Sequence, residues 1–142
     1  MLDALADGRA NPADGTTASG LAALRDALSA DLVAPTPFAI IVANAALPLD
    51  AAAVLAVLAV AELDPAQHHR LADLQGDRAK HRMTIGTLVE TFRLVEGHPG
   101  ALCVSATAPL RTAALVDVIP DGPWSDHIVA LHPSVAWALV GD

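Results

Sequence analysis

The stretch from residue 49 to residue 92 constrains the fold most, because it predicts successive helices joined by very short connections. Asp50 is expected to cap the first helix, whose apolar run is AAAVLAVLAVAEL. Hydrophobic side chains surround nearly the whole circumference of that run. A helix of this kind is stable only when it is buried, so we expect it at the centre of the core.

A second helix is predicted to begin directly after the first. Asp64 provides a capping carboxylate, Pro65 occupies the first helical position, and Gln67 completes a capping-box pattern. Gly76 is expected to end this helix, because glycine readily takes the positive φ found just after helices.

The third predicted helix is capped by Thr84 and has one apolar face. Its apolar side chains follow the helical spacing i, i+3, i+4, i+7 and belong to Ile85, Leu88, Val89 and Phe92. The three helices and their spacing predict a helix-turn-helix core.

A β-hairpin and a last helix are predicted after this core. Ala114–Ile119 and His127–His132 are short β-branched runs, and Pro120–Asp126 between them is dense in turn residues. Pro133–Val140 offers one more apolar helical face. The expected fold class is therefore mostly α with a small β-hairpin (α+β): a winged helix-turn-helix with three helices, a wing and a C-terminal helix.

Three regions of different character divide the chain. Residues 1–20 are poor in large apolar side chains and are predicted to be a flexible tail. Residues 21–46 contain an amphipathic helix predicted over 21–33, and residues 47–142 form the predicted winged-helix domain. Phe38–Val42 is predicted to be a short buried strand because Ile40, Ile41 and Val42 are consecutive β-branched residues, and the alternative is the start of a long buried helix.

Composition favours one compact core without a membrane span. The chain has 142 residues and is 54% hydrophobic, but alanine inflates this fraction, and the longest apolar run covers only residues 51–61. The acidic N-terminus lacks the features of a signal peptide, so we expect a cytoplasmic protein. Cys103 is the only cysteine and is predicted to be a small buried hydrophobe.

Charge is unevenly distributed along the chain. The segment from His68 to Arg82 has four basic and two acidic residues, a local charge of +2, which leaves −10 for the remainder of a chain with net charge −8. Arg78, Lys80 and Arg82 are therefore candidate partner-binding residues. The alternative is a solvated turn without a partner.

The predicted wing carries the opposite sign, with Asp117, Asp121 and Asp126 in or beside the hairpin. Winged helices that read DNA commonly contact phosphates through this element, so the acidic wing opposes binding to nucleic acid. The third helix is expected to expose Thr87, Glu90, Thr91 and Arg93. A protein partner therefore fits the charge pattern better than DNA, and a DNA-binding winged-helix transcriptional regulator remains the alternative function.

No catalytic, cofactor or metal site is predicted. The chain has no GxxxxGK[ST] phosphate loop. His68 and His69 are adjacent on a helix, and His127 and His132 differ by five along a strand, so neither pair is spaced to share one metal ion. We therefore expect a chain that is not an enzyme, with histidines at the surface or in caps.

Two tryptophans are candidate interface residues. Trp124 lies in the predicted wing turn, where a large ring has little core to enter, although it is also able to fold back over the hairpin. Trp137 lies in the last predicted helix and marks a second surface on which a neighbouring domain is able to dock. Trp124 is the preferred partner-binding candidate.

The order of these segments from about Leu47 onward resembles a known family. The matching pieces are Glu62-Leu63-Asp64-Pro65, Asp73-Leu74-Gln75-Gly76-Asp77, the basic stretch ending at Arg82, the helix opened by Thr84, Pro109-Leu110-Arg111, and HIVALHPSVAWALVGD at the end. Together they are similar to the variant winged-helix domain that precedes the ATPase module in certain bacterial AAA+ proteins, including those encoded with contractile injection systems.

This resemblance implies a non-catalytic domain that positions substrates or partners for a AAA+ ATPase. Its partner would be another protein or the ATPase ring, and ATP would bind only through an ATPase module that this sequence does not contain.

Overall fold

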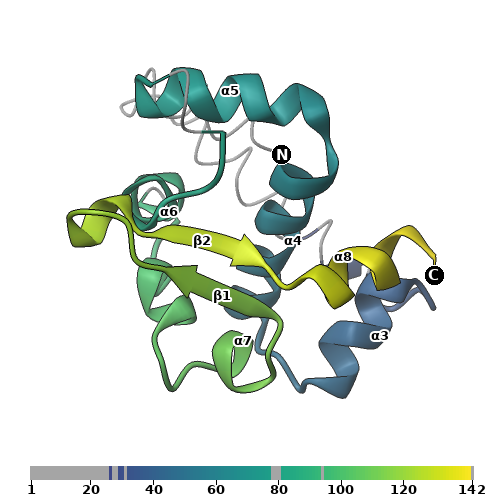
Figure 1. Cartoon of the computed structure of the whole chain (residues 1–142). Coiled ribbons are helices and arrows are strands. Elements are labelled where there is room, and N and C mark those ends of the chain that lie inside the picture. The colour runs from purple at the N-terminus through teal and green to yellow at the C-terminus, as the bar shows by residue number, and fades with distance from the viewer. Residues whose placement is uncertain (1–25, 27–28, 31, 78–80, 94, 142) are drawn as a thin grey trace.

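The computed structural model of the chain describes residues 26, 29–30, 32–77, 81–93 and 95–141. These residues are mostly helical and include one small antiparallel sheet, which confirms the predicted α+β class (Figure 1). The elements are α3 (Pro37–Asn44), α4 (Leu49–Leu63), α5 (Pro65–Gln75), α6 (Ile85–Phe92), η1 (Gly100–Val104), α7 (Pro109–Thr112), β1 (Val116–Ile119), η2 (Trp124–Asp126), β2 (Ile128–Leu131) and α8 (Pro133–Val140). The predicted tail over 1–20 and most of the predicted helix over 21–33 lie outside the described residues.

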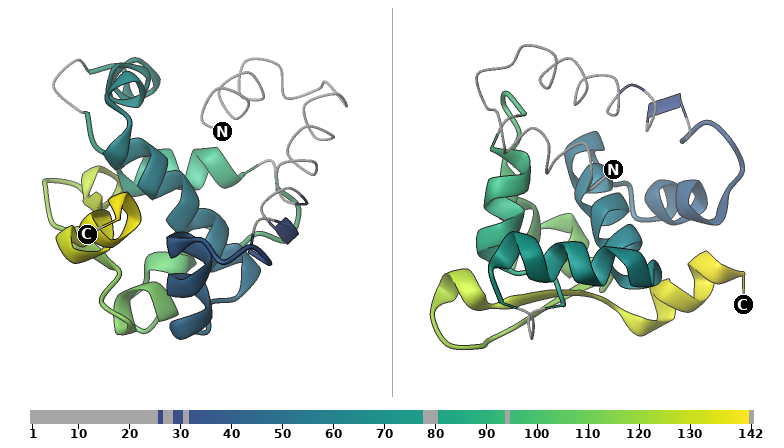
Figure 2. Two further views of the ribbon diagram at one scale, coloured as in Figure 1. Left: turned by 90° about the vertical axis from the view of Figure 1, so that its right-hand side faces the viewer. Right: turned by 90° about the horizontal axis from the view of Figure 1, so that it is seen from above.

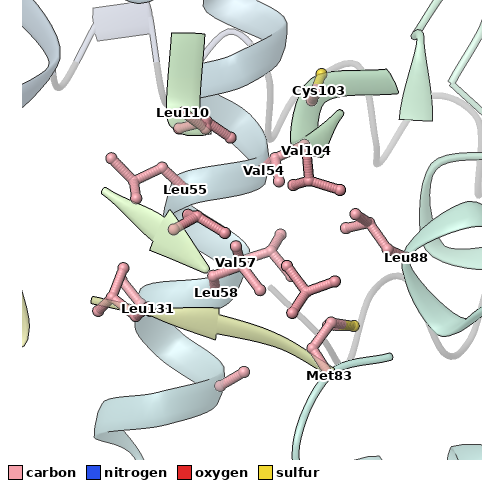
Figure 3. Packing of buried hydrophobic residues seen from close by; sticks show 14 of the residues in the cluster. Val54, Leu55, Val57, Leu58, Met83, Leu88, Cys103, Val104, Leu110 and Leu131 are labelled. Atoms are coloured by element: carbon pink, nitrogen blue, oxygen red, sulfur yellow. The ribbon is translucent and has the colours of Figure 1, made fainter. Parts of the chain in front are cut away.

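Helix α4 forms the centre of the core, as its sequence predicts. Nine of its 15 residues are buried, and it contacts α5, η1, α7, β2 and α8. Figure 3 shows Leu55 and Leu58 of α4 among side chains from the neighbouring elements, including Leu88 of α6 and Leu131 of β2. Among the described helices, none is both long enough and apolar enough to cross a membrane.

The ends of α5 and the start of α6 follow local signals in the sequence. The Asp64 carboxylate accepts a hydrogen bond from the Ala66 amide at 3.0 Å, and Gly76 ends α5 with φ of +67°. Thr84 caps α6 by accepting a hydrogen bond from the Thr87 amide at 3.3 Å. In contrast, the prediction that Asp50 caps α4 is wrong. Pro48 occupies the cap position without a side-chain hydrogen bond, and Asp50 lies in the first turn.

The predicted strand over Phe38–Val42 is wrong, because this segment belongs to helix α3. Thr36 accepts a hydrogen bond from the Ala39 amide at 3.1 Å, and Pro37 occupies the first helical position, which favours helix initiation. The alternative of a long helix is also wrong, since α3 ends at Asn44. Ala46 then takes a positive φ of +51°, which turns the chain toward α4.

The predicted hairpin is present, and an additional segment runs along its second strand. Strands β1 and β2 pair antiparallel in a register that places Val116 opposite Leu131. On the other edge of β2, the Val129 amide donates to the Met83 carbonyl at 2.8 Å, and the Ile85 amide donates to the His127 carbonyl at 3.0 Å. Residues 83–85 therefore lie against the hairpin. Figure 2 shows the hairpin at one side of the molecule with α4 and α6 behind it.

Two short helices that the sequence analysis did not predict separate α6 from the hairpin. Helix η1 spans five residues and α7 spans four, and both contact α4. The expected order of three helices followed directly by a hairpin is therefore incomplete. Segments this short do not produce a recognisable helical period, and Pro109 at the start of α7 was the main local signal.

Candidate functional site

A surface groove of about 680 Å³ lies between α6, residues 95–106 and the hairpin. Its apolar lining has a buried part and an exposed part. The buried apolar residues of the lining are Ile85, Phe92 and Val104, and its large exposed hydrophobic residues are Val89, Leu102 and Trp124. The groove thus combines a packed apolar interior with an apolar rim that is open to solvent.

Trp124 stands at this rim with 61% of its surface exposed. It is the first residue of η2, which lies at the tip of the hairpin beside α6 (Figure 1). It also lines a second hollow, of about 450 Å³, together with residues of α5 and α6. The indole ring therefore does not fold back into the core, although the backbone that carries it is held against the domain.

Close contact between η2 and α6 fixes the position of Trp124. A β-carbon at Gly86 would lie only 3.2 Å from the Ser125 carbonyl oxygen, so the absence of a side chain at residue 86 lets the hairpin tip approach the helix. The Ile85–His127 hydrogen bond anchors the same region. The exposed indole is thus presented by a well-defined backbone, which lowers the entropic cost of binding a partner.

His98 holds the opposite wall of the groove. Its ring stacks on Phe92 with centroids 4.1 Å apart and an interplanar angle of 13°. The Gly100 amide donates to Nδ1 at 2.9 Å, and Nε2 lies 3.1 Å from the Asp50 carbonyl oxygen. Because Nδ1 accepts a hydrogen bond, we assign the ring hydrogen to Nε2, which donates to Asp50. This arrangement attaches the residues before η1 to the first turn of α4.

The charged residues of the groove differ in their partners. The Arg93 guanidinium forms an ion pair with Glu90 at 3.2 Å. Arg111, on α7, is half-buried, and its Nη1 donates to the Val104 carbonyl at 3.3 Å. Within the described residues, Arg111 has no ion-pair partner. Glu96 is the acidic residue in the lining, and Glu90 lies beside the lining as the ion-pair partner of Arg93.

The predicted basic candidates are only partly described. Arg78 and Lys80 lie outside the described residues. Arg82 is exposed and forms an ion pair with Glu62 of α4 at 3.1 Å. It lines a small hollow of about 170 Å³, and Trp124 is not part of that lining. The two hollows described above, which Trp124 lines, do not include Arg82.

A polar network joins the end of α5 to the start of α6. The Gln75 Oε1 atom accepts hydrogen bonds from the hydroxyls of Thr84 at 3.0 Å and Thr87 at 2.9 Å. The expectation that α6 exposes Thr87 is wrong, because the side chain is buried and bonded in this network. Buried hydroxyls need such partners, so the network has a structural explanation.

The remaining candidate groups for chemistry are the cysteine and the histidines. Cys103 is buried, as predicted, and its burial together with the nearby charge of Asp50 raises the pKa of the thiol. His132 caps α8 by accepting the Ser134 amide at 3.3 Å. Within the described ranges, no three histidine, cysteine or acidic side chains are grouped so as to hold a metal ion.

No sequence pattern pointed to the groove residues that come from η1 and α7. Leu102 is 69% exposed, and Arg111 reaches the same groove from the next helix. Each has only a weak signal in the sequence. Leu102 lies in a segment without periodicity, and Arg111 is one arginine among several.

No protein-family model matches this chain, and comparisons with curated proteins and with solved structures return no match.

Proposed function

We propose that this chain is a non-catalytic protein-interaction domain whose groove binds a segment of a partner protein. The observation that carries the proposal is the exposed apolar rim of Val89, Leu102 and Trp124 around a buried apolar interior. Contiguous exposed apolar surface often marks an interaction site, and tryptophan is enriched among residues that dominate binding energy.

A winged-helix architecture is part of this proposal. Three features support it: residues 83–85 lie along one edge of β2, β1 pairs with the other edge, and helices precede the hairpin. In this interpretation, α7 rather than α6 is the helix directly before the wing. The groove then lies between the wing and the helical core.

We also propose, from the sequence resemblance described above, that the domain positions a partner for a AAA+ ATPase, in a bacterial system related to contractile injection. The ATPase module would be supplied outside these 142 residues, and the location would be cytoplasmic. Arg78, Lys80 and Arg82 remain candidates for a second contact with a partner or with the ATPase ring.

A DNA-binding regulator is less well supported. Asp117 and Asp121 are exposed on the hairpin, and Asp126 lies beside Trp124 at its tip. Negative charge on the wing would repel the phosphate backbone, so the charge distribution favours a protein partner.

The two tryptophans provide a matched test of the docking groove. Short random peptides displayed on phage would be selected on the immobilised full chain, and the dissociation constant of the best peptide measured by fluorescence anisotropy. Trp124→Ala should weaken binding by at least about 2 kcal/mol, or roughly thirtyfold, because a rigid aromatic anchor is lost.

Trp137→Ala is the control variant, because Trp137 is equally exposed, at 62%, but lies on α8 and does not line the groove. It should leave the dissociation constant unchanged. Equal effects of the two substitutions, or loss of binding only in Trp137→Ala, would contradict docking in the groove.

A further inference from the structure

The geometry points to a carboxylate-bearing apolar segment of a partner protein as the occupant of the groove, with Arg111 as the residue that binds the Asp or Glu side chain. This inference rests on the proposed docking function and adds the chemistry of the ligand. The apolar rim would bind the hydrophobic side chains of the segment, and Arg111 would favour segments that carry a negatively charged side chain.

Arg111 has hydrogen-bonding capacity left for a ligand. A guanidinium has five N–H donors in a planar fork, and the structure uses Nη1 to reach the Val104 carbonyl. That bond attaches α7 to η1 and fixes where the side chain lies. Because no described carboxylate forms an ion pair with Arg111, an incoming carboxylate would supply the missing counter-charge through short charge-assisted hydrogen bonds.

The other arginine of the groove serves as an internal comparison. Arg93 already has Glu90 as an ion-pair partner at 3.2 Å, and half of its side chain is exposed. A new carboxylate at Arg93 would compete with Glu90 and with water. Arg111 is more shielded from solvent, and its charge is therefore less screened.

Charge complementarity also favours this occupant over others. Arg93 is compensated by Glu90, whereas Arg111 has no ion-pair partner among the described residues, so an incoming carboxylate would meet one uncompensated cation. A second copy of this chain, with a net charge of −8, would be repelled over most of its surface. A nucleic acid needs many cations along its path, and Arg111 is a single cation among apolar side chains. A small organic acid would leave the exposed rim at Leu102 and Trp124 uncovered.

Peptides selected on the full chain supply the probe for the test. We expect them to combine apolar residues with at least one Asp or Glu. For the best such peptide, replacing that residue by the matching amide should weaken binding to the unaltered protein by about tenfold. This comparison requires no change in the protein, so it does not depend on the folding of a variant.

Arg111→Gln should weaken binding of the acidic peptide by about the same factor. This variant should bind the acidic and amide peptides with equal dissociation constants. Arg93→Gln is the matched control and should retain the preference for the acidic peptide. Arg111→Lys keeps the charge but not the planar fork, and should retain part of the preference. Thermal unfolding of each variant would show whether α7 remains attached through the Val104 contact.

Different failures identify different errors. Selected peptides without acidic residues, or a preference for the acidic peptide that survives in Arg111→Gln, would overturn the role of Arg111 while leaving the docking groove in place. Peptide binding that is unchanged in the Trp124→Ala variant would instead contradict docking in the groove. Self-association that depends on Trp124 and excludes the peptide would assign the groove to a second copy, and would also overturn this inference.

Discussion

Cys103 shows how the fold changes the chemistry of a single residue. The side chain belongs to η1 and is buried, and burial is the larger cause of its raised thiol pKa, followed by the negative charge of Asp50. Both factors disfavour the thiolate in the folded protein. The unfolded chain therefore releases this proton at a lower pH than the folded chain does.

Because the thiol pKa is higher in the folded than in the unfolded chain, the protein should lose stability at alkaline pH. The contribution of Cys103 to the free energy of unfolding is fully present below the ordinary thiol pKa, and is lost as the pH rises through that pKa toward the raised folded value. Urea denaturation at a series of alkaline pH values should show a steeper loss of stability for the natural chain than for Cys103→Ala. If the free energy of unfolding depended on pH in the same way for the two proteins, the raised pKa of the Cys103 thiol would be contradicted.

Arg82 and Glu62 show what a residue gains only through tertiary structure. They are 20 positions apart and form an ion pair whose two side chains are partly exposed. Exposed pairs of this kind contribute about 0–1 kcal/mol, so this contact leaves Arg82 available to exchange partners. Its role in partner binding, with Arg78 and Lys80, stays a prediction.

At the scale of elements, the end of α5 allows a direct test of local sequence control. Gly76 has φ of +67°, and a β-carbon there would meet no atom within 4 Å. The cost of Gly76→Ala would come from the left-handed backbone alone. We expect a loss of about 1 kcal/mol in the free energy of unfolding, measured by urea denaturation.

Gly76→Asn is the matched control for this substitution. Asparagine tolerates the left-handed conformation better than alanine, so it should lose less stability. A loss as large in Gly76→Asn as in Gly76→Ala would indicate that something other than backbone conformation limits this position.

Helix α3 is the element where local signals conflicted. Three β-branched residues, Ile40, Ile41 and Val42, favoured a strand, whereas Thr36-Pro37 favoured a helix start. Packing of Ala39 and Val42, three positions apart on one helical face, agrees with the helix signal. β-propensity depends strongly on the availability of a neighbouring strand, and the described structure pairs no strand with this segment.

For the molecule as a whole, the charge distribution predicts weak binding to duplex DNA. Asp117, Asp121 and Asp126 place negative charge on and beside the hairpin, and the whole chain carries −8. At physiological salt we expect a dissociation constant no tighter than about 10⁻⁶ M, the range of non-specific binding. Fluorescence anisotropy with duplex DNA over a salt series would measure it.

A submicromolar dissociation constant with a steep salt dependence would contradict this prediction, because it would require many phosphate contacts. Replacing Arg82 by glutamine would then show whether the basic segment is responsible. Loss of DNA binding in that variant would support the alternative of a winged-helix regulator.

The sequence by itself determined the elements whose boundaries depend on nearby residues. Asp64, Gly76 and Thr84 set the ends of α5 and the start of α6, and the turn-rich segment between two β-branched runs determined the hairpin. Caps and turns act over a few residues, so they are visible without a fold. The burial of α4 was equally predictable, because a helix that is apolar on all sides must be enclosed.

Tertiary structure alone decided which side chains form the groove. Val89, Leu102, Arg111 and Trp124 come from four different elements, and no local pattern links them. Their proximity depends on how α6, η1, α7 and the hairpin pack around α4, which requires the close approach at Gly86 and the attachment of residues 95–100 through His98. Long-range packing, rather than any short motif, therefore created the candidate site.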